Sequence, residues 1–113
     1  SIVRGTTMIT RVKKLRELGA KEVHIRISCP PVKYPCHYGI DFSSRGELIA
    51  AQCTLPEIVS RLDVDSLHYL SIDGLLRSVM HSDSYCLACF TGEYPVPCEE
   101  CDKYRLEGPC GSR

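Results

Sequence analysis

The sequence lacks an excess of charge of either sign. Lys and Arg number 14 together, and Asp and Glu also number 14. Such a balance produces no long-range field that would steer the chain towards nucleic acid or an anionic membrane surface. We therefore expect no nucleic-acid partner and no membrane partner. Any anion that binds must be held by local contacts.

Long hydrophobic runs are also absent. The aliphatic run Leu48-Ile49-Ala50-Ala51 is far shorter than the roughly 18 residues that suggest a membrane span. No charged and then apolar leader stands at the start of the sequence. These absences argue against export and predict a cytoplasmic protein. A length of 113 residues, 43% of them hydrophobic, is that of one modest domain or part of one.

A helix and then a strand are predicted near the start of the chain. Apolar residues recur at helical spacing, with Thr6 or Thr7 as the N-terminal cap and Gly19 at the end. These apolar positions are Ile9, Val12, Leu15 and Leu18. Over residues 22–28 the pattern changes to period two, which is typical of a strand. A loop, a helix and a strand in this order form half of a βαβ unit, so we expect an α/β fold.

Loops and short helices are predicted in the middle of the chain. Residues 29–36 form an extended loop, because each proline lacks an N–H donor and restricts the residue before it. Weak helical character follows over residues 45–51. Thr54 and Glu57 have the spacing of a capping box, which predicts a short helix that ends near Leu62.

A second strand and a further helix complete the predicted elements. The strand lies over residues 66–70, and Ser71 caps a helix over residues 72–80. That helix is expected to bury Leu75, Leu76 and Val79. Beyond Tyr94 the composition shifts to Pro, Cys, Glu and Gly, which predicts a flexible tail.

The chain opens on Ser1-Ile2-Val3-Arg4-Gly5-Thr6-Thr7, which has the composition of an anion-binding loop. Unpaired backbone N–H groups and threonine hydroxyls converge at the start of a helix, where the helix dipole is positive. Gly5 allows the backbone to approach a phosphate closely. The glycine and its two threonines also fit an ordinary capped helix, so these three residues alone leave both interpretations open.

The longer string resembles the second half of the phosphoribosyl pyrophosphate loop of type I phosphoribosyltransferases. The resemblance implies a 5′-phosphate site with backbone donors from Val3, Arg4, Gly5 and Thr6 and hydroxyl groups from Ser1, Thr6 and Thr7. In that family two acidic residues, which contact the ribose hydroxyls and Mg²⁺, stand directly before this string. The resemblance therefore also implies that the chain is the C-terminal part of a longer enzyme and contains no catalytic residue.

Eight cysteines are many for this length, and most of them are crowded near the end of the chain. Without an export signal, free thiols or metal ligands are expected in place of disulfides. Two residues separate Cys86 from Cys89, and cysteines at this spacing can hold one metal ion or one edge of a cluster. Cys36 is a third candidate ligand. Spacing alone leaves zinc, an iron–sulfur cluster and free thiols open.

A closer resemblance, to the glutamine phosphoribosylpyrophosphate amidotransferases, extends over roughly residues 1 to 95. Besides the loop, it is carried by residues 22–28, 35–41, 47–50, 65–67, 74–76 and 86–95. It implies the conversion of glutamine, phosphoribosyl pyrophosphate and water to 5-phosphoribosylamine, glutamate and pyrophosphate, the first step of de novo purine synthesis. It also implies inhibition by purine nucleotides and a homotetramer. An amidase domain with an N-terminal cysteine nucleophile would precede this part of the enzyme.

The same resemblance implies a [4Fe–4S] cluster with Cys36, Cys86 and Cys89 as three ligands and the fourth cysteine before Ser1. Three regions follow from it: the C-terminal part of the phosphoribosyltransferase domain (1–80), a cluster-binding extension (81–95) and the tail (96–113). In the tail, Cys98, Cys101 and Cys110 depart from the family pattern. They leave open either a second metal site or a thiol-bearing end.

Two other functions compete with the enzyme. A phosphoribosyltransferase-like regulator would bind phosphoribosyl pyrophosphate as an effector, but it needs a basic DNA-binding surface and has no use for the cysteines. A free-standing metal-binding module would hold zinc at the tail cysteines. Stoichiometric zinc would favour the module, and iron with sulfide would favour the cluster.

Overall fold

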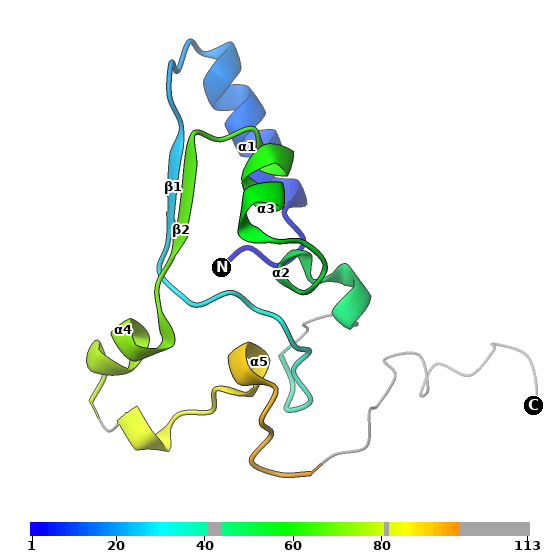
Figure 1. The fold of residues 1–113 in the computed structure, drawn as a ribbon, viewed down its shortest axis with the longest axis vertical. Helices are drawn as coiled ribbons and strands as arrows, with labels where there is room; N and C mark the ends of the chain where they lie inside the picture. Colours follow the sequence, from blue (N-terminus) through cyan, green and yellow to red (C-terminus); the bar gives the residue numbers. More distant parts are fainter. Residues whose placement is uncertain (41–43, 81, 98–113) are drawn as a thin grey trace, which may run out of the picture.

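The computed structural model describes residues 1–40, 44–80 and 82–97 (Figure 1). Its helices are α1 (Thr6–Glu17), α2 (Ile49–Gln52), α3 (Leu55–Leu62), α4 (Ile72–Arg77) and α5 (Ala88–Thr91). Its strands are β1 (His24–Ile27) and β2 (Ser66–Tyr69), and the short 3-10 turns are η1 (Arg45–Glu47) and η2 (Ser82–Ser84). Both predicted strands and the order of the predicted helices are therefore confirmed; the strands and α4 are shorter than predicted, and α5 was not predicted.

The two strands pair in parallel, which confirms the predicted α/β fold. His24 lies opposite Ser66 and Ile27 lies opposite Tyr69. Parallel strands need a long crossover connection, and the segment between β1 and β2 supplies it with η1, α2 and α3. Helices α1 and α3 lie side by side along one face of the strand pair (Figure 1).

The core lies between the strands and these helices. Strands β1 and β2 and helices α1, α2 and α3 each contribute one or two buried side chains, because strands alternate with period two and helices present one face. Its buried members are Ile2, Val12, Val23, Ile25, Ile49, Ala50, Ile58, Leu62, Val64 and Leu67. The segment before α1 and the start of α2 both enter this core, which fixes the opening loop to the rest of the fold.

Helix α1 differs from its prediction at the start and on its surface. The N-cap is Gly5, with φ 86°, and no side-chain cap bond is formed, so the predicted cap at Thr6 or Thr7 is wrong. Val12 is buried, whereas Leu18 is 73% exposed and Ile9 and Leu15 are also exposed. The reason is that α1 packs on α3 along one narrow side. Gly19, with φ 92°, follows the helix end as predicted.

The capping box before α3 is confirmed. The Glu57 carboxylate accepts hydrogen bonds from the Thr54 backbone N (2.6 Å) and the Thr54 hydroxyl (2.8 Å). Ile58 and Leu62 face the core from the helix that this cap begins. A local sequence pattern was sufficient to place this element.

Helix α4 is shorter than predicted. Ser71 caps it, accepting from Gly74 N at 3.0 Å, but the helix ends at Arg77 and not at residue 80. The Ser78 hydroxyl donates to Leu75 O at 2.7 Å and so competes for a carbonyl of the last turn. The expected burial of Leu75, Leu76 and Val79 is wrong, because all three are only half-buried.

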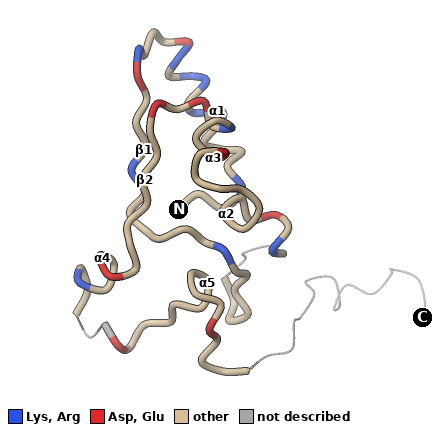
Figure 2. Tube along the Cα trace, viewed as in Figure 1, with Lys and Arg blue, Asp and Glu red and all other residues tan. Residues whose placement is uncertain are grey.

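Residues of both charge signs are interspersed along the chain (Figure 2). Basic and acidic residues lie near one another around the end of α1 and the turns that lead into β1 and β2, in agreement with the balanced composition. Within the described ranges, the helices are all too short or too polar to cross a membrane.

Candidate functional site

The opening loop and the start of α1 surround a hollow of about 370 Å³. All six residues that the sequence assigned to the 5′-phosphate line it, together with three neighbours. The lining consists of Ser1, Ile2, Val3, Arg4, Gly5, Thr6, Thr7, Met8 and Arg11. Ile2 is buried in the core while Thr6 and Thr7 are exposed, so the loop is anchored on one side and open to ligand on the other.

The hollow lies at the positive end of a helix dipole. Gly5 O accepts from Ile9 N at 3.0 Å, so the N–H groups of the first helical residues precede the intrahelical ladder and point outwards. Over the 12 residues of α1 the aligned peptide dipoles favour an anion at this end. Arg11, one turn further along α1, adds a basic side chain to the lining.

The segment from Glu47 to Ile49 contacts the opening loop at three consecutive residues. Ile49 N donates to Val3 O at 2.9 Å, and Arg4 forms an ion pair with Glu47 at 3.1 Å. A Cβ atom on Gly5 would lie 3.0 Å from Ile49 Cδ1, so only glycine fits there without displacement. Sequence reasoning missed Glu47, because its partner is 43 positions away and no local pattern reports such a contact.

The proposed cluster ligands lie where the proline-rich loop crosses α5. The Cys89 carbonyl accepts from Lys33 N (3.0 Å) and Tyr34 N (3.1 Å), which fixes the loop against the helix. Gly92, with φ 82°, ends α5, and a Cβ atom there would lie 2.8 Å from the Tyr34 ring. Lys33 and Tyr34 are thus packed tightly against the end of the Cys-x-x-Cys segment and the turn after it.

The second half of the loop, which contains Cys36, packs against the residues that follow α5. The Tyr94 hydroxyl donates to Pro35 O at 2.8 Å, and the His37 and Tyr94 rings lie 4.5 Å apart. Tyr38 and Val96 share two hydrogen bonds, with the Tyr38 hydroxyl donating to Val96 O at 2.7 Å and accepting from Val96 N at 3.1 Å. His37 therefore packs against the Tyr94 ring, and two hydrogen bonds fix Val96 to the Tyr38 side chain.

Four of the described thiols, those of Cys29, Cys36, Cys86 and Cys89, lie in one region but are not assembled as a metal centre. Burial raises the pKa of the Cys89 thiol, and negative charge at Cys36, Cys86 and Cys29 raises it further. Cys29 is thus a nearby thiol that the sequence analysis did not assign. In the part of the chain that the structure describes, no three His, Cys, Asp or Glu side chains are close enough to hold a metal ion. The tail residues Cys98, Cys101 and Cys110 lie outside the described residues.

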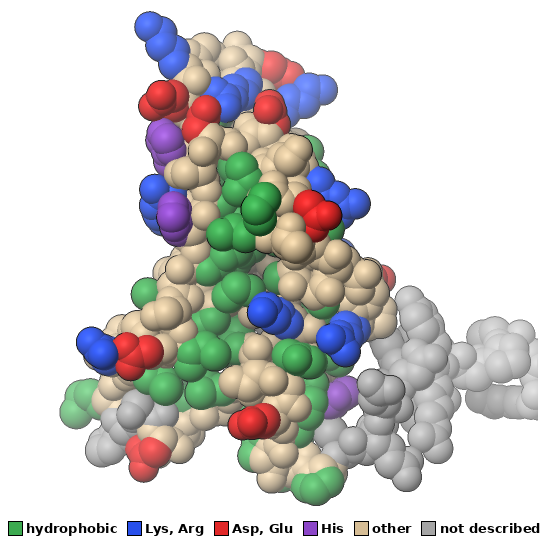
Figure 3. All heavy atoms as spheres, viewed as in Figure 1, with side chains coloured by type: hydrophobic (Ala, Val, Ile, Leu, Met, Phe, Trp, Pro, Cys, Tyr) green, Lys and Arg blue, Asp and Glu red, His purple; other side chains and the backbone are tan. Residues whose placement is uncertain are grey.

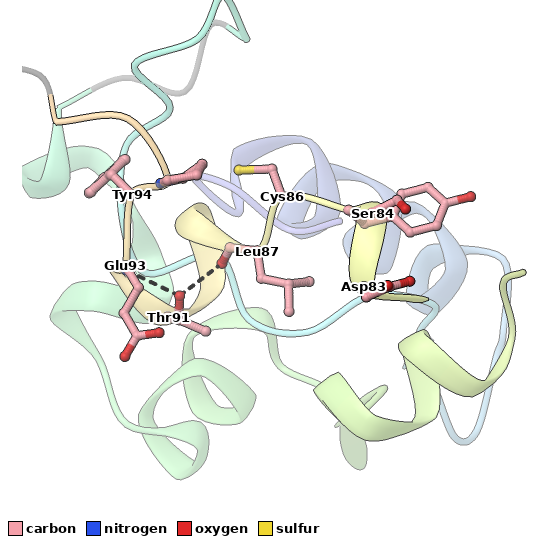
Figure 4. Close-up of a pocket in the computed structure, with 9 residues that line it drawn as sticks. Asp83, Ser84, Cys86, Leu87, Thr91, Glu93 and Tyr94 are labelled. Atoms are coloured by element: carbon pink, nitrogen blue, oxygen red, sulfur yellow. Dashed lines mark hydrogen bonds between the residues drawn. The ribbon is translucent and has the colours of Figure 1, made fainter. Parts of the chain in front are cut away.

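Cys86 lines a shallow hollow of about 500 Å³ between η2 and the segment after α5 (Figure 4). Thr91 connects two other residues of the lining, because its hydroxyl donates to Leu87 O at 3.2 Å and accepts from Glu93 N at 3.1 Å. The Cys86 side chain is exposed, as expected of a thiol that is not packed into the core.

A third hollow, of about 670 Å³, lies beside the carboxyl ends of the two strands. Apolar side chains gather through the middle of the face shown in Figure 3. The hollow is lined from β2 by His68 and Tyr69 and from α3 by Leu55 and Ile58. Within the described residues, the Tyr69 hydroxyl is buried without a hydrogen-bond partner.

The chain is similar to amidophosphoribosyltransferases from archaea and bacteria. It is 52% identical over 107 residues to the enzyme of Archaeoglobus fulgidus, a match that covers 90% of this chain and 23% of the relative. The Synechocystis enzyme is 55% identical over 97 residues, which cover 85% of this chain and 20% of the relative. No family model matches the chain. The chain spans about a fifth of the length of these relatives.

Solved structures show the same similarity. The glutamine phosphoribosylpyrophosphate amidotransferase of Bacillus subtilis, complexed with ADP and GMP, superposes with a TM-score of 0.80 at 46% identity. The match covers 90% of this chain and 24% of that structure. A structure described as the allosteric regulatory enzyme of purine biosynthesis also has a TM-score of 0.80, at 47% identity, over 88% of this chain and 23% of its own. The chain belongs to the amidophosphoribosyltransferase family.

Proposed function

We propose that this chain is the C-terminal part of an amidophosphoribosyltransferase and supplies its 5′-phosphate site. The enzyme would convert glutamine, phosphoribosyl pyrophosphate and water to 5-phosphoribosylamine, glutamate and pyrophosphate. The observation that carries the proposal is the hollow at the start of α1, lined by Ser1, Val3, Arg4, Gly5, Thr6 and Thr7, in a chain of this family.

The chemistry of the loop is positioning and charge stabilisation. Backbone N–H groups at the start of α1 and the hydroxyls of Thr6 and Thr7 would bind the phosphate, with the helix dipole favouring its charge. A fixed 5′-phosphate orients the ribose, so that ammonia can attack C1 as pyrophosphate leaves. The catalytic contribution of this segment would be orientation, since none of its described residues is proposed as a nucleophile.

The test of the phosphate site uses threonine variants of the complete protein. Replacing Thr6 and Thr7 together by Ala should raise the KM for phosphoribosyl pyrophosphate about 10- to 100-fold, because charge-assisted hydrogen bonds to the phosphate are lost. Hydrolysis of glutamine should continue. Thr10→Ala is the matched control, since Thr10 is on the same helix and its hydroxyl donates to Thr6 O at 3.3 Å. Equal KM values for the two variants would exclude the Thr6 and Thr7 hydroxyls as phosphate ligands.

The proposed cofactors are a [4Fe–4S] cluster and Mg²⁺. Thiolates are suitable ligands for iron–sulfur clusters, and Cys36, Cys86 and Cys89 lie on segments that hydrogen bonds hold together. The described thiols are not yet gathered as ligands, so cluster binding would draw them together and recruit a fourth cysteine from before Ser1. The acidic ligands of Mg²⁺ would also precede Ser1. Residues 1–80 would belong to the transferase domain and residues 81–95 to the cluster-binding extension.

The coding sequence before Ser1 and metal analysis test these assignments. The proposal expects two acidic residues directly before Ser1, a further cysteine and an amidase domain whose mature chain starts with cysteine. Anaerobic reconstitution should give about four iron and four sulfide per complete chain. Stoichiometric zinc would contradict the cluster, and a missing acidic pair would contradict the enzyme.

Regulation and assembly are proposed by analogy with the relatives. The Bacillus subtilis structure is a complex with ADP and GMP, and we propose that purine nucleotides also inhibit the enzyme that contains this chain. We further propose a homotetramer in the cytoplasm. Inhibition by GMP and a tetrameric mass in solution are the expected results.

A further inference from the structure

We propose that Glu47 is a positioning residue for the phosphate loop, which it holds in its binding conformation through Arg4. The proposal rests on the function proposed above and adds a residue outside the loop to it. Glu47 lies at the end of η1, 43 positions from Arg4, and is not among the residues that line the hollow.

Three consecutive loop residues contact one short segment of the crossover connection. Val3 O accepts from Ile49 N at 2.9 Å, Arg4 Nη2 donates to Glu47 Oε2 at 3.1 Å, and Gly5 leaves room for Ile49 Cδ1. The contacts are of three kinds: a backbone hydrogen bond, an ion pair and close packing. Together they fix the part of the loop at which the chain turns into α1.

The segment is itself anchored, so it can serve as a support. Leu48 is 0% exposed, and Ile49 and Ala50 are also buried. Glu47 N donates to Ser44 O at 2.9 Å and Ala51 N donates to Leu48 O at 3.0 Å, which defines the backbone on both sides of Leu48. Glu47 therefore presents its carboxylate from a rigid part of the fold, as positioning of a site requires.

The negative charge of Glu47 argues that it positions the loop and does not itself bind the phosphate. A carboxylate near an anion site repels the anion, so Glu47 by its own charge opposes phosphate binding. The Arg4 guanidinium offsets that charge, and the pair contributes no net charge to the site. What the pair adds is a defined position for Arg4, and with it for the adjoining Gly5.

The solvent exposure of the Arg4–Glu47 pair argues that its role is to position the loop and not to stabilise the fold. The Arg4 and Glu47 side chains are 50% and 43% exposed, and ion pairs that are exposed contribute little to folding stability. The Asp73–Arg77 pair, at 2.8 Å, is the suitable comparison, because it is also exposed but connects two positions of one helix. Removing the Arg4–Glu47 pair should therefore affect the loop and leave the fold intact.

The experiment compares Glu47→Gln with Asp73→Asn in the complete protein. Glu47→Gln should raise the KM for phosphoribosyl pyrophosphate about 3- to 10-fold, because a less ordered loop must be fixed when the ligand binds. The rate constant kcat, the hydrolysis of glutamine and the urea concentration at half-unfolding should match those of Asp73→Asn. An unchanged KM would overturn the proposal. A lowered KM would also overturn it, because it would show that Glu47 acts only by repelling the ligand.

The double variant Arg4→Met, Glu47→Gln tests whether Glu47 acts through Arg4. If it does, Glu47→Gln should change the KM by less than about 1.5-fold once Arg4 has been replaced, because coupled residues are not additive. Additive effects would overturn the proposal. Failure of the proposed function is distinguishable, because a wild-type protein that forms no phosphoribosylamine fails before any variant is compared.

Discussion

At the scale of single residues, the Tyr69 hydroxyl has a desolvation cost that no hydrogen bond in the described part of the chain offsets. The hydroxyl is buried and has no partner there. Burial raises the pKa of this phenol, and negative charge at Cys29 raises it further, so the group stays neutral and unpaired. A buried polar atom without a partner loses its bonds to water and gains nothing in exchange.

We expect Tyr69→Phe to raise the free energy of unfolding of the chain by about 0.5–1.5 kcal/mol, because it removes this desolvation penalty while keeping the ring. Tyr94→Phe is the matched control. The same hydroxyl deletion there removes a donor to Pro35 O at 2.8 Å and should lower the stability by about 1 kcal/mol. Urea unfolding monitored by circular dichroism measures both. A loss of stability in Tyr69→Phe would mean that the hydroxyl has a partner.

At the scale of elements, the N-terminal caps of α3 and α4 should differ in importance. Thr54→Ala should lower the free energy of unfolding by about 1 kcal/mol, since it removes one half of the capping box. Helix α3 contributes Ile58 and Leu62 to the core, so its fraying costs burial as well. Ser71→Ala should cost less, because α4 has no buried residue. Equal losses in urea unfolding would contradict this distinction.

The same two helices show what a sequence can reveal about elements. The capping box and the strand alternation were predictable, because each depends on residues within a few positions of one another. The end of α4 was misplaced because a single serine hydroxyl, that of Ser78, competes for a carbonyl of the last turn. Burial was the less predictable property: the apolar spacing of α1 predicted the helix, but which of its apolar residues were buried depended on where α3 packs.

In the candidate site, too, residues that are neighbours in the sequence were predictable and distant contacts were not. The loop residues that line the hollow were assigned from the string at the start of the chain, and the hollow brings all six together. Glu47 and Ile49 were not assigned, because their contacts with the loop depend on the crossover connection and not on sequence neighbours. The cysteine assignments were carried by resemblance, and they stay a prediction until a metal is measured.

At the scale of the whole molecule, Asp65 connects segments far apart in the sequence. Its carboxylate accepts from Val23 N at 2.7 Å, just before β1, and from Arg16 at 2.8 Å, at the end of α1. Arg16 also donates to Lys21 O at 2.7 Å. The Asp65–Arg16 pair thus connects the end of α1, the turn that follows it and the residues just before β1 and β2.

This junction predicts an acid sensitivity with a defined sign. The Val23 N–H, and to a lesser extent the Arg16 guanidinium, hold the pKa of Asp65 below its ordinary value of 3.8. The unfolded chain therefore takes up the proton first as the pH falls. The stabilisation is fully present above the unfolded-state pKa and is lost as the pH falls through the lower folded-state pKa.

Asp65→Asn should consequently be less stable than the wild type at about pH 7 and should lose less stability on acidification to about pH 2. Urea unfolding of the chain at both pH values measures the difference. Arg16→Met separates the two causes: because the Val23 N–H is the larger one, most of the acid sensitivity assigned to Asp65 should survive in this variant. If Arg16→Met abolished this acid sensitivity as fully as Asp65→Asn does, the ion pair and not the backbone donor would be its main cause.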